Sequence, residues 1–172
     1  MNLAIWPYMK IDGSWTIPIE VIIGAWKTMA DMDRVKATFY DGSIENAGEF
    51  IEFMQDPTIL PALIVDRDDI RLYLLAWLSN ISNGTAQGHF CYLDKYRKEI
   101  AQKMLDYWRG IPLLRVIVGI TPESYTLVLK IIERTGFKIV GTIPEACYMH
   151  YHDRTEGGVL SYYLTEGEKD GR

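Results

Sequence analysis

The sequence predicts a mixed α/β fold, and three observations lead to this prediction. First, three β-rich segments follow one another with only short links, which is typical of an antiparallel meander. Second, Asn83-Gly84 separates two of them, and this dipeptide strongly favours a tight hairpin turn. Third, an amphipathic segment at 95–109 lies between the last of them and a further apolar segment, so it forms a crossover that makes the two flanking strands parallel.

Two helices are expected before the strands. Pro18 suits a first helical turn, and the apolar residues after it share one helical face, namely Ile19, Ile22, Ile23, Trp26 and Ala30. A second helix should begin with Ser43 as its N-cap and end before Asp56-Pro57. Its buried stripe is predicted to be Ala47, Phe50, Ile51 and Met54.

The remaining elements are assigned from the same periodicities. The expected strands are residues 59–65, 70–82, 85–93, 113–120, 138–150 and 158–164. The helix at 95–109 should bury Ile100, Ala101, Met104, Leu105 and Trp108. Thr121-Pro122-Glu123 has the chemistry of a helix start, and Gly136 has that of a left-handed helix end. We therefore expect a helix from about 121 to Arg134 with Glu123 in its first turn.

Composition narrows the function classes. The 172 residues suit one domain, expected over 1–165, with a disordered charged tail at 166–172. A net charge of −5 argues against a nucleic-acid partner, and no apolar run is long enough to form a membrane-spanning helix. Cys91 and Cys147 show no metal-ligand spacing, and the N-terminus does not read as a secretory signal. We expect a protein of the reducing cytoplasm with no bound metal.

The C-terminal half carries a recognisable stretch, which reads TPESY at 121–125, Val at 128 and IIERTGFKIVG at 131–141. It resembles the Asn-x-x-Ala-x-x-Leu-Tyr-Glu-Lys-x-Gly-Phe helix and following strand of the GNAT superfamily of N-acyltransferases. By the order of elements the resemblance covers residues 40–164. Tyr125 stands where Asn is usual, and Ile132 stands where many members have the tyrosine that protonates the departing thiolate.

A second stretch, YLDKYRKEIA at 92–101, resembles the family's loop Arg-x-x-Gly-x-Gly/Ala, whose backbone amides hold the coenzyme A diphosphate at a helix N-terminus. It keeps the Tyr-Arg entry and the Ile-Ala helix start once one residue is deleted from the turn, but it contains no glycine. A side chain in place of glycine blocks the close approach of phosphate to the backbone. The charges of Arg97 and Lys98 are expected to compensate in part for the missing glycines. The resemblance implies that the following residues contact the donor: Cys91, Tyr92, Arg97, Lys98, Glu99, Ile100, Ala101, Ser124 and Tyr125.

The resemblance also implies an architecture and a reaction. The sheet should be mostly antiparallel with flanking helices, and the parallel strands 85–93 and 113–120 should splay apart to admit the pantetheine arm of acetyl-CoA. An amine would attack the thioester directly, and a backbone N–H near Cys91 or Tyr92 would stabilise the oxyanion. Acetyl-CoA is thus the expected donor and an amine of unknown identity is the second substrate.

Three residues are candidates for proton transfer. His89 is the only group in its strand that titrates near neutrality, so it is a base or water-orienting residue unless it is a half-buried structural histidine. Tyr125, with Ser124 beside it, is a candidate for protonating the thiolate or contacting the pantetheine. Glu123 is a weaker catalytic candidate because the helix dipole alone explains an acid in a first turn. Cys91 shares a strand face with His89, but a buried thiol is favoured over a nucleophile pair.

The preferred interpretation is an acetyl-CoA-dependent N-acyltransferase. The missing loop glycines, the absence of a strand carboxylate near His89 and the apolar Ile132 leave one alternative of another class, a catalytically silent ligand-binding or protein-interaction module with the same fold. An acyltransferase that uses another acyl donor is the third hypothesis. The oligomeric state does not follow from the sequence.

Overall fold

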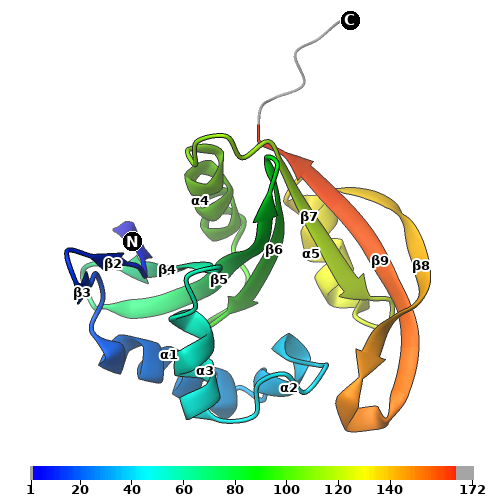
Figure 1. Cartoon of the computed structure of the whole chain (residues 1–172), viewed down its shortest axis with the longest axis horizontal. Helices are drawn as coiled ribbons and strands as arrows, with labels where there is room; N and C mark the ends of the chain where they lie inside the picture. The colour runs from blue at the N-terminus through cyan, green and yellow to red at the C-terminus, as the bar shows by residue number, and fades with distance from the viewer. Residues whose placement is uncertain (1, 166–172) are drawn as a thin grey trace, which may run out of the picture.

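The computed structural model describes residues 2–165, which form a mixed α/β fold around a seven-stranded sheet of order β1-β4-β5-β6-β7-β9-β8 (Figure 1). The strands pair antiparallel except for β6 and β7, which are parallel. The sheet strands are β1 (Leu3–Pro7), β4 (Leu60–Asp66), β5 (Arg71–Ser82), β6 (Thr85–Tyr92), β7 (Val116–Pro122), β8 (Lys138–Met149) and β9 (Arg154–Leu164). The helices are α1 (Ile19–Asp31), α2 (Val35–Thr38), α3 (Ala47–Met54), α4 (Lys98–Arg109) and α5 (Thr126–Arg134).

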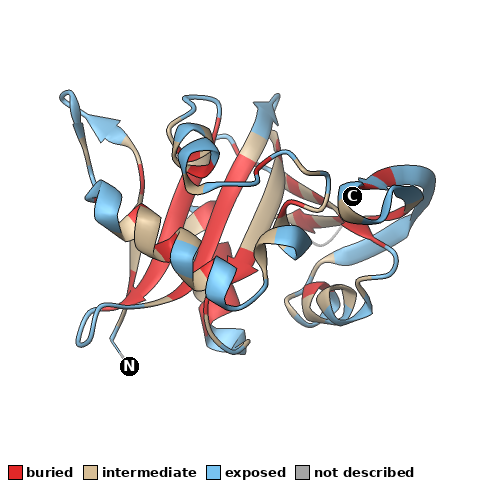
Figure 2. Cartoon of the chain, turned by 90° about the horizontal axis from the view of Figure 1, so that it is seen from below, coloured by how far each residue is buried: buried red, intermediate tan, exposed pale blue. Residues whose placement is uncertain are grey.

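Two hydrophobic cores lie on opposite faces of the sheet, because successive side chains of a strand point to opposite sides. Along β5, Leu75 and Trp77 join the core covered by α1 and α3, whereas Leu74 and Ala76 join the core covered by α4. The central strands are accordingly buried along most of their length (Figure 2). The strand β8 is mostly exposed and forms one edge of the sheet.

The structure confirms the predicted mixed α/β class, the antiparallel meander and the parallel pair joined by a helix. Asn83 and Gly84 both have positive φ, 51° and 79°, as a tight hairpin turn requires. The helix α4 buries all five of the residues expected on its apolar face. Gly136 ends α5 with φ 96°, and Phe137 N–H donates to the Ile132 carbonyl at 3.2 Å.

The N-terminal region differs from the prediction. The sequence did not predict the edge strand β1, which has only five residues, too few for a clear sequence pattern, and is stabilised by its pairing with β4. It also did not predict the short helix α2 or the two-stranded ribbon of β2 (Lys10–Ile11) and β3 (Ser14–Trp15). The helix α1 forms where predicted, but its buried residues are Ile22, Ala25 and Met29, so the predicted face is rotated and Ala30 is exposed.

Ser43 is not a helix N-cap. Its N–H and its hydroxyl both bond Asp41 Oδ1, at 3.1 and 2.7 Å, which closes a turn before the helix. The N-cap of α3 is Asn46, whose Oδ1 accepts from Glu49 N–H at 3.1 Å. A side chain three residues downstream of the expected cap therefore sets the start of the helix.

The predicted helix start at Thr121-Pro122-Glu123 is also wrong. Thr121 and Pro122 end β7, and α5 begins only at Thr126. Pairing with β9 overrides the local signal, because Pro122 lies opposite Gly158 and Glu123 N–H donates to the Gly157 carbonyl at 2.9 Å. Glu123 is therefore not in a helical first turn. Leu113, predicted to start a strand, is 83% exposed with φ 66°, and β7 begins at Val116.

The expected tail at 166–172 lies outside the described residues. Within residues 2–165, none of the helices has the length and apolarity that crossing a bilayer requires. The His, Cys, Asp and Glu side chains of the same residues form no group of three or more that could hold a metal ion.

Candidate active site

The parallel strands β6 and β7 part from each other, as predicted. Their register holds only from Thr85–Val116 to Gln87–Val118, yet β6 continues to Tyr92 and β7 to Pro122. A cavity of about 370 Å³ lies between the separated ends, lined by residues of both strands, of α5 and of the segment 34–40. The two strands run side by side at one end and diverge toward the other in Figure 1.

The separated part of β6 turns a row of peptide groups toward this cavity. In an antiparallel pair every second residue directs its N–H and C=O groups to the partner strand. Leu93 N–H donates to the Tyr73 carbonyl of β5 at 2.8 Å, so Cys91 and His89 also direct their peptide groups to β5. The N–H and C=O groups of Gly88, Phe90 and Tyr92 therefore point to the other side of β6, where β7 is no longer paired with it. Tyr92 thus remains a candidate oxyanion donor, and the Cys91 amide is directed away from the cavity.

His89 lines the cavity and is held from two sides. Its ring stacks on Trp77 with centroids 5.0 Å apart and 5° between the planes. Its Nε2 lies 2.9 Å from Ser79 Oγ. Burial lowers the pKa of His89 from 6.5 to about 4, against a smaller opposing effect of the Asp41 charge. His89 is therefore neutral at pH 7, which suits hydrogen bonding to a water or amine better than holding a proton.

This lowered pKa makes the stability of the protein depend on pH. Between pH 6.5 and about 4 the unfolded chain binds a proton at His89 that the folded chain excludes, so the free energy of unfolding falls as the pH is lowered through this window. The full difference amounts to roughly 3 kcal/mol. We expect urea unfolding at pH 7.5 and pH 5 to show a smaller loss of stability for His89→Gln than for the wild type. Parallel pH profiles would contradict the assignment.

Two tyrosines form the other side of the cavity. Tyr125, at the start of α5, and Tyr40, from the segment after α2, meet edge to face with ring centroids 6.1 Å apart. Tyr40 Oη lies 3.6 Å from Cys147 Sγ. Burial raises the pKa of both phenols, and the Glu156 charge raises that of Tyr125 further. Both hydroxyls are protonated at neutral pH and are proton donors by chemistry.

Tyr40 is a cavity residue that the sequence analysis missed. It belongs to no expected element, and its place depends on a long-range contact in which His150 N–H donates to its carbonyl at 2.8 Å. Ile132 also lines the cavity and is buried, so the tyrosine that many family members have there has no counterpart on α5 at that position.

Glu123 and Ser124 do not line the cavity. Glu123 Oε1 accepts from Gly157 N–H at 3.2 Å, which fastens the end of β7 to β9. Ser124 Oγ donates to Glu156 Oε1 at 2.6 Å. These contacts give both residues a structural role, and the catalytic interpretation of Glu123 has no support from its position.

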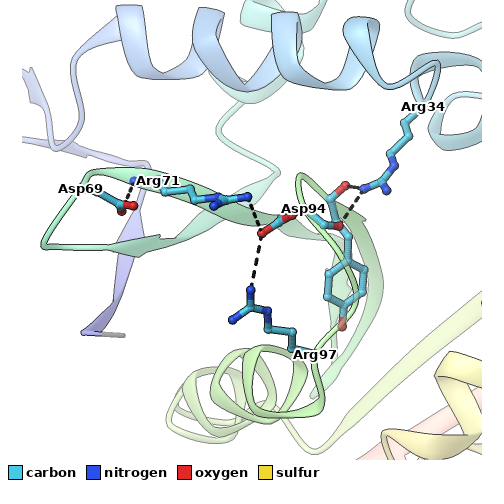
Figure 3. A network of polar contacts seen from close by, with 6 residues as sticks. Arg34, Asp69, Arg71, Asp94 and Arg97 are labelled. Carbon is cyan, nitrogen blue, oxygen red and sulfur yellow. Dashed lines mark hydrogen bonds and ion pairs between the residues drawn. The ribbon is translucent and has the colours of Figure 1, made fainter.

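Three arginines from different parts of the chain contact the turn between β6 and α4 (Figure 3). Arg34, before α2, donates to the carbonyls of Tyr92 and of Asp94, the latter at 3.2 Å. Asp94 Oδ2 lies 3.0 Å from Arg71 Nη2 and 4.0 Å from Arg97 Nη2. Arg34 and Arg71 escaped the sequence analysis because neither lies in the stretch that resembles the diphosphate loop.

The four predicted donor contacts at the start of α4 differ in their exposure to solvent. Ile100 and Ala101 are buried in the core beside α4, and their N–H groups donate to the Arg97 carbonyl at 3.1 and 3.3 Å. Lys98 and Glu99 are exposed on the first turn. Among these four residues, only Lys98 and Glu99 have side chains that a ligand in solvent could contact.

Cys91 lines the cavity as a buried thiol. Burial raises its pKa, outweighing the lowering effects of Thr38 and the Arg34 charge, so the group is not a ready nucleophile. This agrees with the inert-thiol interpretation.

A mixed sheet whose parallel pair parts around a cavity, with a helix starting at its mouth, is the fold of the GNAT N-acyltransferases, and solved structures show the same fold. One is spermidine N-acetyltransferase from Vibrio cholerae in complex with CoA and spermine, with 15% identity, 95% of this chain and 96% of that chain covered, and a TM-score of 0.70. A point mutant of the spermidine N-acetyltransferase SpeG, from the same organism, gives 15% identity, 96% and 95% coverage and a TM-score of 0.70. A structure of spermidine/spermine N-acetyltransferase SpeG in complex with manganese ions, also from Vibrio cholerae, has 15% identity and a TM-score of 0.66, with 95% of this chain and 93% of that chain covered.

The sequence matches no protein-family model and no curated protein sequence. At 15% identity, the structural likeness defines the fold of this chain.

Proposed function

We propose that the protein is an acetyl-CoA-dependent N-acetyltransferase that transfers the acetyl group to an amine by direct attack on the thioester. The observation that carries this proposal is the parting of β6 and β7 around a cavity of about 370 Å³, with β6 peptide groups directed into it. Strand edges of this kind can hold the amide groups of a pantetheine arm as a further strand would. The likeness to an N-acetyltransferase in complex with CoA and spermine supports the same assignment.

The reaction needs a place for the negative charge that develops on the thioester oxygen. When the amine nitrogen bonds to the carbonyl carbon, that oxygen becomes an oxyanion, and a fixed N–H donor stabilises it. Among the predicted donors, the Tyr92 N–H takes this role, because the alternation along β6 directs it away from β5. The carbon–sulfur bond then breaks and the amide product forms.

Proton transfers complete the reaction. An amine bound as an ammonium loses a proton to solvent through a water that neutral His89 holds by a hydrogen bond, and the nitrogen loses a second proton by the same route once it has bonded to the carbonyl carbon. The departing thiolate takes a proton from a hydroxyl in the cavity. Tyr125 is the candidate donor, since Ile132 has none to give, and solvent reprotonates it afterwards.

The acceptor is proposed to be a cationic amine because the negative charges of two carboxylates, Asp41 and Glu156, act on side chains that line the cavity. The charge of Asp41 acts on His89 and on Tyr40, and the charge of Glu156 acts on Tyr125. The protein as a whole carries a net charge of −5. Such a field raises the local concentration of cations.

Thermal unfolding with acetyl-CoA tests the proposal first. Binding to the folded state at 100 times the dissociation constant should add ~2.7 kcal/mol to the free energy of unfolding. Release of free thiol on adding spermidine or other primary amines then tests turnover. Binding without thiol release would favour the silent module, and no stabilisation at millimolar acetyl-CoA would refute the proposal.

A further inference from the structure

Arg34 lines the cavity beside the end of β6, and we infer that it is the positioning residue of the oxyanion site. Its guanidinium binds the Tyr92 carbonyl, so the Tyr92 N–H on the same edge of the strand stays directed at the thioester oxygen. This role rests on the proposed function, to which it adds a residue from outside both stretches that resemble the family. Arg34 comes from the short segment between α1 and α2.

The Tyr92 carbonyl lies on the edge of β6 that β7 leaves unpaired. A residue that does not bond one neighbouring strand directs both its N–H and its C=O group to the other side. Tyr92 therefore presents both groups to the cavity, because the pairing of β6 with β7 ends at Gln87. The carbonyl oxygen carries a partial negative charge close to the N–H that is proposed to hold the oxyanion. An exposed oxygen there would repel the oxyanion.

Arg34 occupies this carbonyl. Its Nη1 donates to the Tyr92 carbonyl and, at 3.2 Å, to the Asp94 carbonyl. Figure 3 shows Arg34 reaching the end of β6 from the side of α1. The peptide unit between Tyr92 and Leu93 is thereby held at both ends, because Leu93 N–H donates to the Tyr73 carbonyl at 2.8 Å. A peptide unit fixed at both ends keeps the direction of the strand, and with it the direction of the preceding N–H.

The backbone of Arg34 is fixed as well. Its N–H donates to the Met29 carbonyl, in the last turn of α1, at 2.8 Å. Its carbonyl accepts from Thr38 N–H, in α2, at 2.9 Å. The half-buried side chain therefore starts from the junction of two helices. Groups that are held in place before the reaction cost no reorganisation when charge develops in the transition state.

The positive charge of Arg34 is not paired with a carboxylate among residues 2–165. It binds the carbonyl of Asp94, whose carboxylate is paired with two other arginines instead. The remaining neighbour of the Tyr92 carbonyl oxygen is the Cys91 thiol, a weak donor at 3.7 Å. Burial raises the pKa of that thiol and the Arg34 charge opposes the rise, so the charge acts on a side chain that lines the cavity. An unpaired positive charge at this place favours an oxyanion in the cavity.

Kinetics of Arg34→Met test this role, with acetyl-CoA and the amine that gives the fastest thiol release in the wild type. We expect kcat to fall about tenfold or more, because the donor N–H loses its fixed direction and the oxyanion loses a nearby charge. The dissociation constant of acetyl-CoA, measured by calorimetry, should stay unchanged, because the bound thioester carries no oxyanion. Arg34→Lys keeps a charged N–H donor and should retain most of kcat.

Lys36→Met is the matched control. Lys36 carries the same charge two residues further on, is exposed, lies 5.4 Å from the centroid of the Tyr151 ring and does not line the cavity. Its substitution should leave kcat unchanged. Urea unfolding of each variant verifies that it is folded.

Hydrogen exchange of the Leu93 amide, followed by NMR, reports the same contact without any substrate. Exchange should be about tenfold faster in Arg34→Met, because its peptide unit loses one of two hydrogen bonds, while the Met104 amide in α4 keeps its rate.

A wild-type kcat in folded Arg34→Met would overturn the inference and leave the proposed function standing. So would weaker binding of acetyl-CoA with no loss of kcat, equal losses of kcat in Arg34→Met and Arg34→Lys, or a loss of kcat without faster Leu93 exchange. If the wild type itself transfers no acetyl group, the proposed function fails, and this role of Arg34 fails with it.

Discussion

Replacing Val128 with tryptophan is expected to abolish the binding of acetyl-CoA while the protein remains folded. Val128 lies on α5, is half-buried and lines the cavity between β6 and β7. Because its side chain has open space on the cavity side, a larger ring can extend into that space without displacing core residues. A cavity of about 370 Å³ that is partly filled this way cannot also hold a pantetheine arm.

The effect should exceed about a hundredfold in the dissociation constant, because the ligand must displace the indole or remain outside. Calorimetric titration with acetyl-CoA measures it, and the midpoint of urea unfolding verifies the fold. Lys130→Trp is the control, since Lys130 is exposed on the same helix and does not line the cavity. Unchanged affinity in folded Val128→Trp would mean that the donor does not enter between the strands, and the proposed function would lose its basis.

The parting of β6 and β7 could be predicted from the sequence, but only in part from its physics. Periodicity and the Asn83-Gly84 turn indicated the strands, and the crossover helix indicated their parallel direction. That the strands separate beyond Gln87 followed from the family resemblance, because nothing in an apolar strand pattern states where its pairing ends. The structure shows what the approach of the two strands requires just beyond the last paired residue. A Cβ at Gly88 would lie 2.6 Å from Ile117 Cγ2, so a glycine is needed where β6 passes this side chain of β7.

Residues whose position depends on long-range contacts were beyond the reach of the sequence. Arg34 and Tyr40 come from one segment and Arg71 from β5, both far in sequence from the motif, and no spacing rule links them to it. The same cause explains the wrong helix start at Glu123, where pairing with β9 outweighs a favourable capping sequence. Local patterns predict an element well where the pattern itself determines which side chains are buried, as in α4. They predict it poorly where pairing with a strand distant in sequence determines the backbone conformation, as at the end of β7.

Trp77→Ala is expected to cause the largest loss of stability of any change at the site. Trp77 is 2% exposed on β5 and contacts several aromatic rings. Its centroid lies 5.7 Å from Phe39 and 5.0 Å from His89, both nearly parallel to it, and 5.7 Å from Phe53 at a steep angle. Removing a fully buried tryptophan costs about 3–5 kcal/mol, because apolar burial is lost and a cavity remains. Urea unfolding at pH 7.5 measures this loss.

The same substitution should also change the titration of His89. Trp77 covers one face of the imidazole, and burial is the main cause that lowers its pKa to about 4. When the indole is absent, water reaches the ring and its pKa should rise toward 6.5, which NMR titration of the histidine resonances can follow.

Phe50→Ala separates the two effects of the Trp77 substitution. Phe50 is fully buried in the same core and contacts Trp26 and Phe39 rather than His89. It should lose ~3–5 kcal/mol of stability by the same reasoning and leave the His89 pKa near 4. If both variants raised the pKa equally, general loosening of the core would explain the change. A rise confined to Trp77→Ala shows that the stacked indole itself keeps His89 neutral in the cavity.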